Sequence, residues 1–181
     1  TAAVVFLSVA LAKSEGFSAL KGKLLRLFAW RFFIPVATLA LLAETLLFQT
    51  FVLQNAPIAD DESVYVFIAK TLLGGRVANP APQDPEFFAN QFLVLDGYRW
   101  YGKYPIGHPL LLALGEAAGL RFVIVTLVAC GVFLLTYLVG RRLFSHNRAC
   151  LSLCLLLLSP HFVFMAASQL SQPASSLTMM L

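Results

Sequence analysis

A nearly unbroken apolar run over residues 32–53 dominates the pattern of this sequence, with only Pro35, Glu44 and Gln49 interrupting it. A helix needs about 20 apolar residues to cross the roughly 30 Å hydrocarbon core of a bilayer, so the run predicts a transmembrane helix. Composition agrees, because 59% of the residues are hydrophobic and 12% are charged, against about 45–50% and 25% in average soluble domains. The sequence therefore predicts a membrane protein.

Two later apolar runs, residues 121–139 and 149–167, predict further spans. Residues 1–12 are apolar but too short to cross a bilayer, and we interpret them as the end of a span that begins upstream. The expected fold class is all-α, a polytopic transmembrane helical bundle with short amphipathic helices in an outer loop. Because the chain opens and ends within apolar runs, residues 1–181 are interpreted as the N-terminal part of one larger transmembrane domain.

Basic residues gather in two segments beside the apolar runs, residues 13–31 and 140–148. These residues are Lys13, Lys21, Lys23, Arg26, Arg31, Arg141, Arg142 and Arg148. By the positive-inside rule both segments face the cytoplasm, and residues 54–120 form the outer loop. The basic residues form no patch interleaved with aromatics, so no nucleic-acid partner is predicted. We expect a multi-pass protein of the bacterial inner (plasma) membrane, with the lipid bilayer as a partner.

The outer loop opens with ADDESVYVFIAKTLLGG, residues 59–75, in which apolar residues recur at three- and four-residue spacing. This periodicity predicts a short amphipathic helix. Asp60 can cap the start of the helix, and the Gly74-Gly75 pair can end it.

Three consecutive carboxylates, Asp60, Asp61 and Glu62, are the best candidates for chemistry. Asp61 shares one helical face with Tyr65 and Ala69. Acids at a helix N-terminus gain roughly 0.3 to 1 kcal/mol each, so capping alone explains one or two of them. Three carboxylates within one turn repel one another unless they share a cation, a basic side chain or a proton. Helix capping and a functional acidic site both stay open as interpretations.

A proline-rich connector, NPAPQDP at residues 79–85, follows the amphipathic helix and cannot be regular helix or a central strand. Asp96-Gly97 then marks a tight turn, and residues 109–120 predict a second short helix. The aromatic residues after the turn are typical of a membrane interface. They are Tyr98, Trp100, Tyr101 and Tyr104.

Three polar side chains of the same region are further candidates. Arg99 and Lys103, in the same loop as the acids, can neutralise them or hold a lipid phosphate. His108, between Gly107 and Pro109, is either a ligand or base, or a hydrogen-bonding structural residue, which is the commoner role for a lone histidine in a turn.

The order of these features, from about Phe32 to the C-terminus, resembles the GT-C glycosyltransferases of the protein-mannosyltransferase and aminoarabinose-transferase type. Two short motifs in their membrane context carry the resemblance. The first is Asp61-Glu62-x-x-Tyr65-x-x-x-Ala69 with Gly74, and the second is Gly97-Tyr98-x-x-Tyr101-Gly102-Lys103-Tyr104-Pro105-x-Gly107-x-Pro109-Leu110-Leu111-Leu112-Ala113.

Such enzymes move a sugar from a polyprenyl-phosphate donor to an acceptor outside the cytoplasm, and their first outer loop supplies the catalytic carboxylate. The resemblance implies that Asp61 is the general base or the electrostatic partner of the acceptor hydroxyl. Glu62 or Asp60 would assist, or Asp61 and Glu62 would bind a divalent cation, Mg²⁺ or Mn²⁺. Lys103 matches a basic position that contacts the donor phosphate. The other candidate substrate-binding residues are Tyr65, Arg99, Tyr104 and His108.

One departure concerns the later Ser-Pro segment, after which family members often carry a Ser-His pair. This chain has Ser171-Gln172 there, so a histidine-dependent role at that point does not transfer. The alternative function is that of a non-enzymatic polytopic membrane protein, a transporter or a lipid-binding assembly subunit. The sequence leaves the sugar and the acceptor open.

Overall fold

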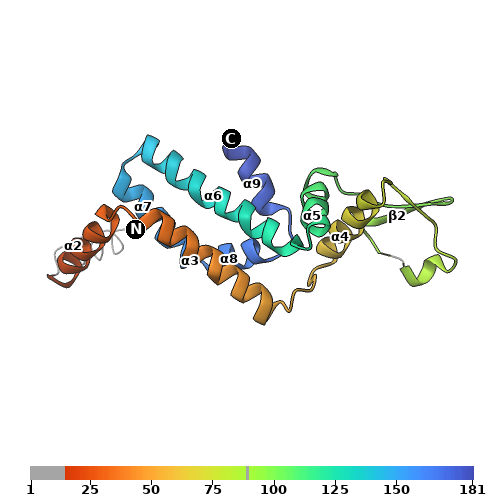
Figure 1. Cartoon of the computed structure of the whole chain (residues 1–181), viewed down its shortest axis with the longest axis horizontal. Helices are drawn as coiled ribbons and strands as arrows, with labels where there is room; N and C mark the ends of the chain where they lie inside the picture. The colour runs from red at the N-terminus through yellow and green to blue at the C-terminus, as the bar shows by residue number, and fades with distance from the viewer. Residues whose placement is uncertain (1–14, 89) are drawn as a thin grey trace, which may run out of the picture.

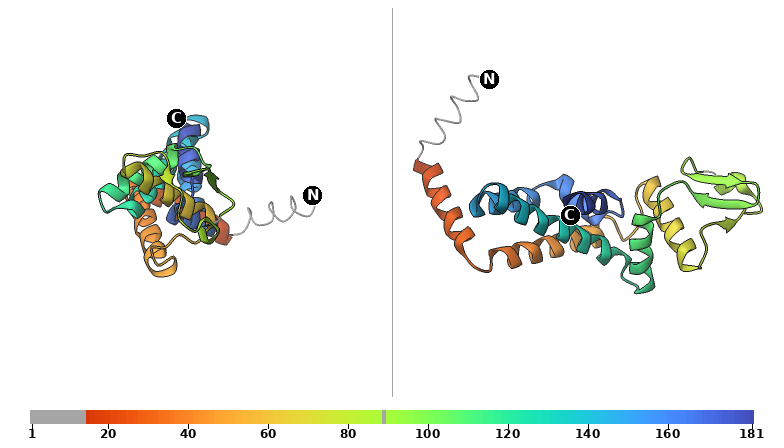
Figure 2. Two further views of the ribbon diagram at one scale, coloured as in Figure 1. Left: turned by 90° about the vertical axis from the view of Figure 1, so that its right-hand side faces the viewer. Right: turned by 90° about the horizontal axis from the view of Figure 1, so that it is seen from above.

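The computed structural model describes residues 15–88 and 90–181 and shows an elongated, mostly helical molecule (Figure 1). A helical bundle occupies one part of the molecule, and the outer loop extends from one end of it. The helix α2, Glu15–Ala29, lies at the other end, at a steep angle to the bundle (Figure 2). The span fragment expected at residues 1–12 lies outside the described residues.

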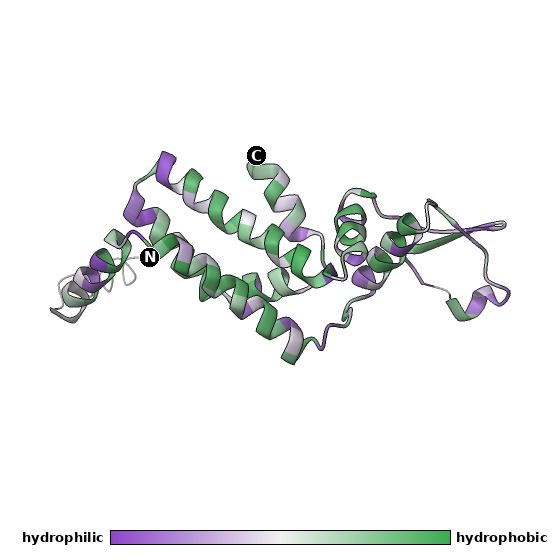
Figure 3. Cartoon of the chain, in the orientation of Figure 1, coloured by the Kyte–Doolittle hydropathy of each residue, from purple (hydrophilic) through white to green (hydrophobic). Residues whose placement is uncertain are grey.

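Within the described residues, two helices are long and apolar enough to cross a membrane. The first is α3, Phe33–Leu47, which continues as a π-helical turn, η1, Phe48–Val52. The second is α6, Arg121–Leu143. The segments expected at 32–53 and 121–139 are therefore confirmed as apolar helices of spanning length. Figure 3 shows hydrophobic residues along most of both helices.

The span expected at residues 149–167 is not one continuous helix. The structure has two helices there, α7 (His146–Leu157) and α8 (Pro160–Ala167), bent by 70° at the break between them. Ser159 caps α8, because its Oγ accepts a hydrogen bond from the Phe162 N–H at 3.3 Å. Pro160 occupies the first helical position, where its missing N–H costs nothing. The pair can cross a membrane only as one broken span.

Apolar side chains of α3, α6 and α7 hold the bundle together. Leu41, Phe133 and Leu153 are fully buried at its centre, one from each helix. The last helix, α9 (Gln172–Met180), packs on α6. At that contact a Cβ on Gly131 would lie 3.0 Å from Leu177 Cδ1, so the glycine permits the close approach.

The outer loop contains the two expected helices, α4 (Asp60–Leu73) and α5 (Gly107–Ala117), which pack against each other. Tyr65 and Ala69 of α4 form a buried apolar cluster with Leu112 and Ala113 of α5. The predicted end of α4 is confirmed, because Gly75 adopts a left-handed conformation (φ +69°) directly after it. Only glycine reaches this conformation at little cost.

The outer loop also contains a small antiparallel sheet, beside the short helices expected there. The strands β1 (Asn79–Pro80), β2 (Leu93–Asp96) and β3 (Arg99–Gly102) pair in the order β1-β3-β2. The proline of β1 lies on an edge strand, where its missing N–H is tolerated. The turn predicted at Asp96-Gly97 joins β2 to β3, with Gly97 at φ +59°.

The base of the hairpin rests directly on α4. A Cβ on Gly102 would lie 2.5 Å from Ile68 Cδ1 and 3.0 Å from Val64 Cγ1, so a larger residue would require the Ile68 side chain or the strand to shift. Because Lys103 and Tyr104 follow immediately, this contact fixes where they leave the sheet.

Candidate functional site

The acidic start of α4 is not capped by a side chain. Ala59 is the N-cap residue, with extended backbone angles (φ −112°, ψ 152°), and no side chain accepts a hydrogen bond there. The prediction that Asp60 caps the helix is therefore wrong, because Asp60 is itself the first helical residue. Its remaining contribution is its charge near the positive end of the helix dipole.

The three carboxylates occupy three different environments. Consecutive helical residues point about 100° apart, so Asp60 is exposed, Asp61 is half-buried and Glu62 is fully buried. Because the three side chains point in different directions, the repulsion between their carboxylates is limited even without a shared cation or basic side chain.

Asp61 is held by Tyr104, which lies two residues after the end of β3. The Tyr104 hydroxyl donates to Asp61 Oδ1 at 2.6 Å, the short distance typical of a charge-assisted hydrogen bond. Burial, and then the bond to Asp61, raise the pKa of Tyr104 above its ordinary value. The hydroxyl therefore keeps its proton and acts as a permanent donor to the carboxylate.

Tyr65 connects every element of the site. Its ring packs on Tyr104 (centroids 4.8 Å apart, planes at 38°) and edge-on against His108 (4.9 Å, 83°). Its hydroxyl shares a hydrogen bond with Ser171 Oγ at 3.1 Å. The predicted common face of Asp61, Tyr65 and Ala69 agrees with these contacts, since Asp61 and Tyr65 both meet Tyr104, and Tyr65 and Ala69 pack with α5.

His108 is a neutral imidazole that donates from one ring nitrogen and keeps the other unprotonated. Its Nε2 lies 2.8 Å from the Gln169 carbonyl oxygen, which can only accept, so Nε2 carries the proton. Burial lowers the pKa of His108, while the bond to Gln169 partly opposes that shift. Nδ1 is then unprotonated, and it is buried without a partner among the described residues. This nitrogen is available to accept a hydrogen bond.

Glu62 is a buried acid that is only partly satisfied. Its Oε2 accepts the Ile58 N–H at 3.3 Å, whereas Oε1 has no partner among the described residues. Burial raises the pKa of Glu62 above its ordinary value of 4.5, hydrogen bonds from the Ile58 and Gln169 backbones lower it, and nearby Asp61 raises it further. The net shift of the Glu62 pKa is upward, so the folded state holds the proton more strongly than the unfolded state does.

We expect Glu62→Gln to remove a pH dependence of stability. Because the folded pKa is raised, the native state binds more protons than the unfolded state at pH values above about 4.5. Stability contributed by Glu62 is therefore full at low pH and is lost as the pH rises through the folded pKa. Thermal unfolding of the detergent-solubilised protein between pH 4 and 8 should show the variant gaining stability over wild type as pH increases. The exposed Asp60→Asn serves as control, and a variant that follows the wild-type profile would contradict the shift.

The two basic candidates lie apart from the acids. Lys103 Nζ donates to the Gln91 carbonyl at 3.1 Å and lies 4.4 Å from the centre of the Phe92 ring. The Phe92 ring in turn packs on Tyr104, with centroids 5.4 Å apart. Arg99 is exposed at the hairpin turn. Among the described side chains neither residue forms an ion pair with the acidic triplet.

Asp61 and Glu62 do not form a cation site in this geometry, because Tyr104 holds one carboxylate and the Ile58 backbone holds the other. Within residues 15–88 and 90–181, no group of three or more His, Cys, Asp or Glu side chains is placed to hold a metal ion. Among the described residues the predicted divalent cation has no shared ligand set, and the cation stays a prediction.

Sequence reasoning missed the contribution of the turn before α9. Gln169 supplies the carbonyl that orients His108, and Ser171 supplies the hydroxyl that meets Tyr65. Gln169 is 1% exposed and its Oε1 has no described partner. Gln49, in η1, is 2% exposed, and neither atom of its amide has a described partner. The available signal for Gln49 was its place within the apolar run of residues 32–53, whereas Gln169 lies in a polar segment that gives no such signal.

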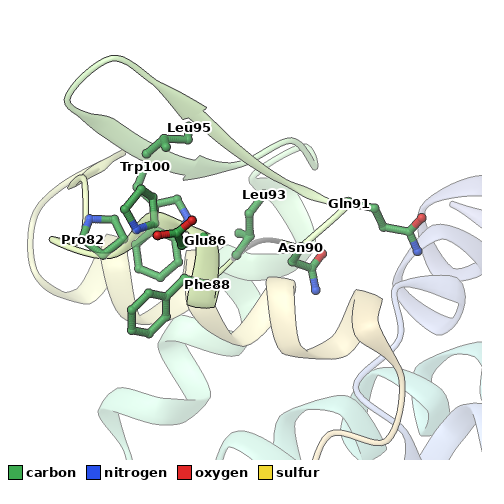
Figure 4. Close-up of a pocket in the computed structure, with 9 residues that line it drawn as sticks. Pro82, Glu86, Phe88, Asn90, Gln91, Leu93, Leu95 and Trp100 are labelled. Carbon is green, nitrogen blue, oxygen red and sulfur yellow. The ribbon is translucent and has the colours of Figure 1, made fainter.

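A separate hollow of about 620 Å³ lies between the 3₁₀ turn Pro85–Phe88 and the hairpin (Figure 4). Trp100 lines it, and the indole also contacts the rings of Phe67 and Phe88. Figure 4 shows Gln91 at the opposite end of the hollow from Pro82. Neither Asp61 nor Tyr104 lines this hollow, so the carboxylate site is distinct from it.

The Asp61–Tyr104–Tyr65–His108 group therefore combines a half-buried carboxylate, a fixed donor and a neutral histidine. A scan of protein-family models, a search of curated proteins and a search of solved structures each find no match to this chain.

Proposed function

We propose that this chain is part of a multi-pass glycosyltransferase of the bacterial inner membrane. It would move a sugar from a polyprenyl-phosphate donor to an acceptor on the non-cytoplasmic face. The observation that carries the proposal is that the two motifs of the resemblance meet in space. Asp61 and Tyr65 come from the first motif, and they contact Tyr104 and His108 from the second.

Asp61 is the residue best suited to act as the base. It is half-buried, so an acceptor can reach it while part of its surface is shielded from water. In the proposed step the acceptor oxygen forms a bond to the anomeric carbon of the sugar, and the bond from that carbon to the phosphate oxygen breaks. The electron pair leaves with the polyprenyl phosphate, and the acceptor proton goes to the Asp61 carboxylate.

Tyr104 and Tyr65 position that base. The Tyr104 hydroxyl fixes the orientation of the carboxylate and leaves the second oxygen free of this bond. Tyr65 holds Tyr104 and His108 in place through its ring. His108 is held by the Gln169 carbonyl and packs edge-on against the Tyr65 ring. Glu62, fully buried, supports the start of α4.

Lys103 is proposed to meet the charge of the leaving phosphate. One N–H of its ammonium group is used by the Gln91 carbonyl, and the side chain is exposed. An ammonium group has three donors, so two remain for a phosphate oxygen. Lys103 directly precedes Tyr104 in the sequence, and Tyr104 contacts the proposed base, Asp61.

We expect Lys103→Ala to weaken binding of a labelled polyprenyl-phosphate sugar by about 1.5 to 3 kcal/mol, the range for a hydrogen bond to a charged group. That corresponds to roughly 10- to 150-fold in Kd. Lys103→Arg should recover part of the loss. Lys70→Ala, which removes another exposed lysine of the outer loop, should leave Kd unchanged. Equal Kd values for Lys103→Ala and wild type would mean that Lys103 does not bind the donor phosphate.

A non-enzymatic function, that of a transporter or a lipid-binding assembly subunit, is favoured by one specific feature. Transporters bind substrates at broken helices near the membrane midplane. Here α7 and α8 form a broken pair, and Glu44 borders a hollow of about 490 Å³ beside the break. Glu44 is exposed and forms no ion pair with a described side chain. If Glu44→Gln abolished the protein's function in cells while Asp61→Asn left that function normal, the non-enzymatic alternative would be favoured.

A further inference from the structure

A groove runs between α2 and α7 at the end of the bundle away from the outer loop. It holds about 380 Å³ and is mainly apolar. The α2 wall is one helical stripe, since Lys21, Leu24, Leu25 and Phe28 follow each other at spacings of three, one and three residues. Leu20 extends this wall. The α7 wall is formed by Asn147, Arg148 and Leu151.

Hydrogen bonds tie the two walls together. His146, at the start of α7, donates from Nε2 to the Phe28 carbonyl at 2.9 Å, because a carbonyl oxygen only accepts. Nδ1 of the same ring then accepts the Tyr137 hydroxyl at 3.0 Å. Phe28 itself is 4% exposed and belongs to the bundle core. The groove is therefore part of the packed structure and not a gap beside a loose helix.

Two cations border this apolar surface. Lys21 and Arg148 are both exposed, one on each wall. Neither forms an ion pair with a side chain that the structure describes. Lys21 is notable because it lies on the apolar stripe of α2, whereas Lys23 points elsewhere on the helix. A lysine on an apolar face keeps its stem on that face and extends its charge to the edge.

We propose that the groove binds an anionic phospholipid of the cytoplasmic leaflet. Its phosphate lies between Lys21 and Arg148, and the upper part of an acyl chain lies over the leucines of the groove. A ligand with an anionic head and an apolar tail matches both the two cations at the edge of the groove and the leucines that line it. A soluble phosphate would leave those leucines exposed. The surrounding segments, 15–31 and 140–148, contain one acid, Glu15, against many basic residues, which suits an anionic leaflet. Figure 3 shows hydrophilic residues at this end of the bundle and on α2.

The proposal rests on the membrane placement given above and is independent of sugar transfer. Binding is therefore measured without any sugar donor. The full-length protein, solubilised in detergent, is titrated with phosphatidylglycerol or with phosphatidylcholine of the same acyl chains, and bound lipid is read by native mass spectrometry. We expect a one-to-one complex with phosphatidylglycerol, and weaker binding of phosphatidylcholine. Inorganic phosphate should not displace the lipid.

The decisive comparison uses two double variants that lose the same charge. A basic residue near an anionic membrane surface contributes about fivefold in affinity, so Lys21→Gln with Arg148→Gln should weaken phosphatidylglycerol binding roughly 5- to 30-fold. Lys23→Gln with Arg142→Gln removes two exposed cations that do not line the groove and should have a much smaller effect. Leu20→Ser should weaken both lipids, and Leu27→Ser, exposed but outside the groove, neither.

Three results would overturn the proposal. Equal losses in the two double variants would mean diffuse electrostatic attraction with no site. Equal affinity for the two lipids would mean that the groove does not select a lipid with a net negative charge. No complex with either lipid would mean that another segment or partner covers the groove. Failure of sugar transfer in the same preparation would leave each of these readouts unchanged.

Discussion

Replacement of Asp61 by asparagine is expected to slow sugar transfer roughly 100- to 10,000-fold, the usual effect of losing a general base. The amide has nearly the shape of the carboxylate and can still accept the Tyr104 hydroxyl, so the contact that holds it survives. It cannot take a proton from the acceptor. The measurement is the initial rate of transfer by the full-length protein in membranes, from a polyprenyl-phosphate sugar to the acceptor it uses.

The neighbouring acids provide matched controls on the same helix turn. Asp60→Asn changes an exposed side chain that does not cap the helix, and its rate should stay near that of wild type. Glu62→Gln alters a buried acid that does not face Tyr104, and it should slow transfer less than Asp61→Asn. Near-normal transfer by Asp61→Asn, with an unchanged unfolding temperature, would remove Asp61 from the catalytic role.

Replacement of Tyr65 by alanine is expected to destabilise the protein by about 3–5 kcal/mol, the range for deleting a large buried aromatic side chain. Tyr65 is 7% exposed and packs on Tyr104, His108 and the apolar cluster of α4 and α5. Denaturant or thermal unfolding of the solubilised protein measures the loss. The same change should also release Tyr104 and so reduce transfer.

Two further substitutions separate the contributions of Tyr65. Tyr65→Phe keeps the ring and removes only the bond to Ser171, so it should cost about 0.5–1.5 kcal/mol. Tyr98→Ala deletes a tyrosine of the same loop that is 77% exposed, and its effect should stay within about 0.5 kcal/mol. If Tyr65→Ala were no more harmful than Tyr98→Ala, Tyr65 could not be the residue that joins the elements of the site.

Local patterns made the helices of this chain predictable. The period of apolar residues and the Gly74-Gly75 stop located α4, and uninterrupted hydropathy located α3 and α6. The small sheet was harder to predict because its strands are two to four residues long, too short to establish alternation. Its turn was evident from Asp96-Gly97, but its pairing depends on the contact between Gly102 and α4. The Ser159-Pro160 pair marks the break between α7 and α8, whereas its 70° angle depends on packing.

The candidate site could be predicted in its members but not in its contacts. Asp61 and Tyr104 are 43 positions apart, and Tyr65 and Ser171 are 106 apart. Such pairs form only when helices pack, and no local period encodes them. For the same reason the burial of Glu62 could not be foreseen beside the exposure of Asp60. Lys103 was expected near the acids, and the cross-strand geometry instead placed its ammonium group on Gln91 and Phe92.

The most direct test of the proposed function is cleavage of the donor by the full-length protein reconstituted in liposomes. Polyprenyl-phosphate mannose and polyprenyl-phosphate aminoarabinose, labelled in the lipid, are supplied with a membrane extract as the source of acceptor, and free polyprenyl phosphate is quantified. We predict release above that of empty liposomes with at least one donor, and a fall of roughly 100-fold or more in Asp61→Asn. Folded wild-type protein that releases no more polyprenyl phosphate than empty liposomes from either donor would contradict the account.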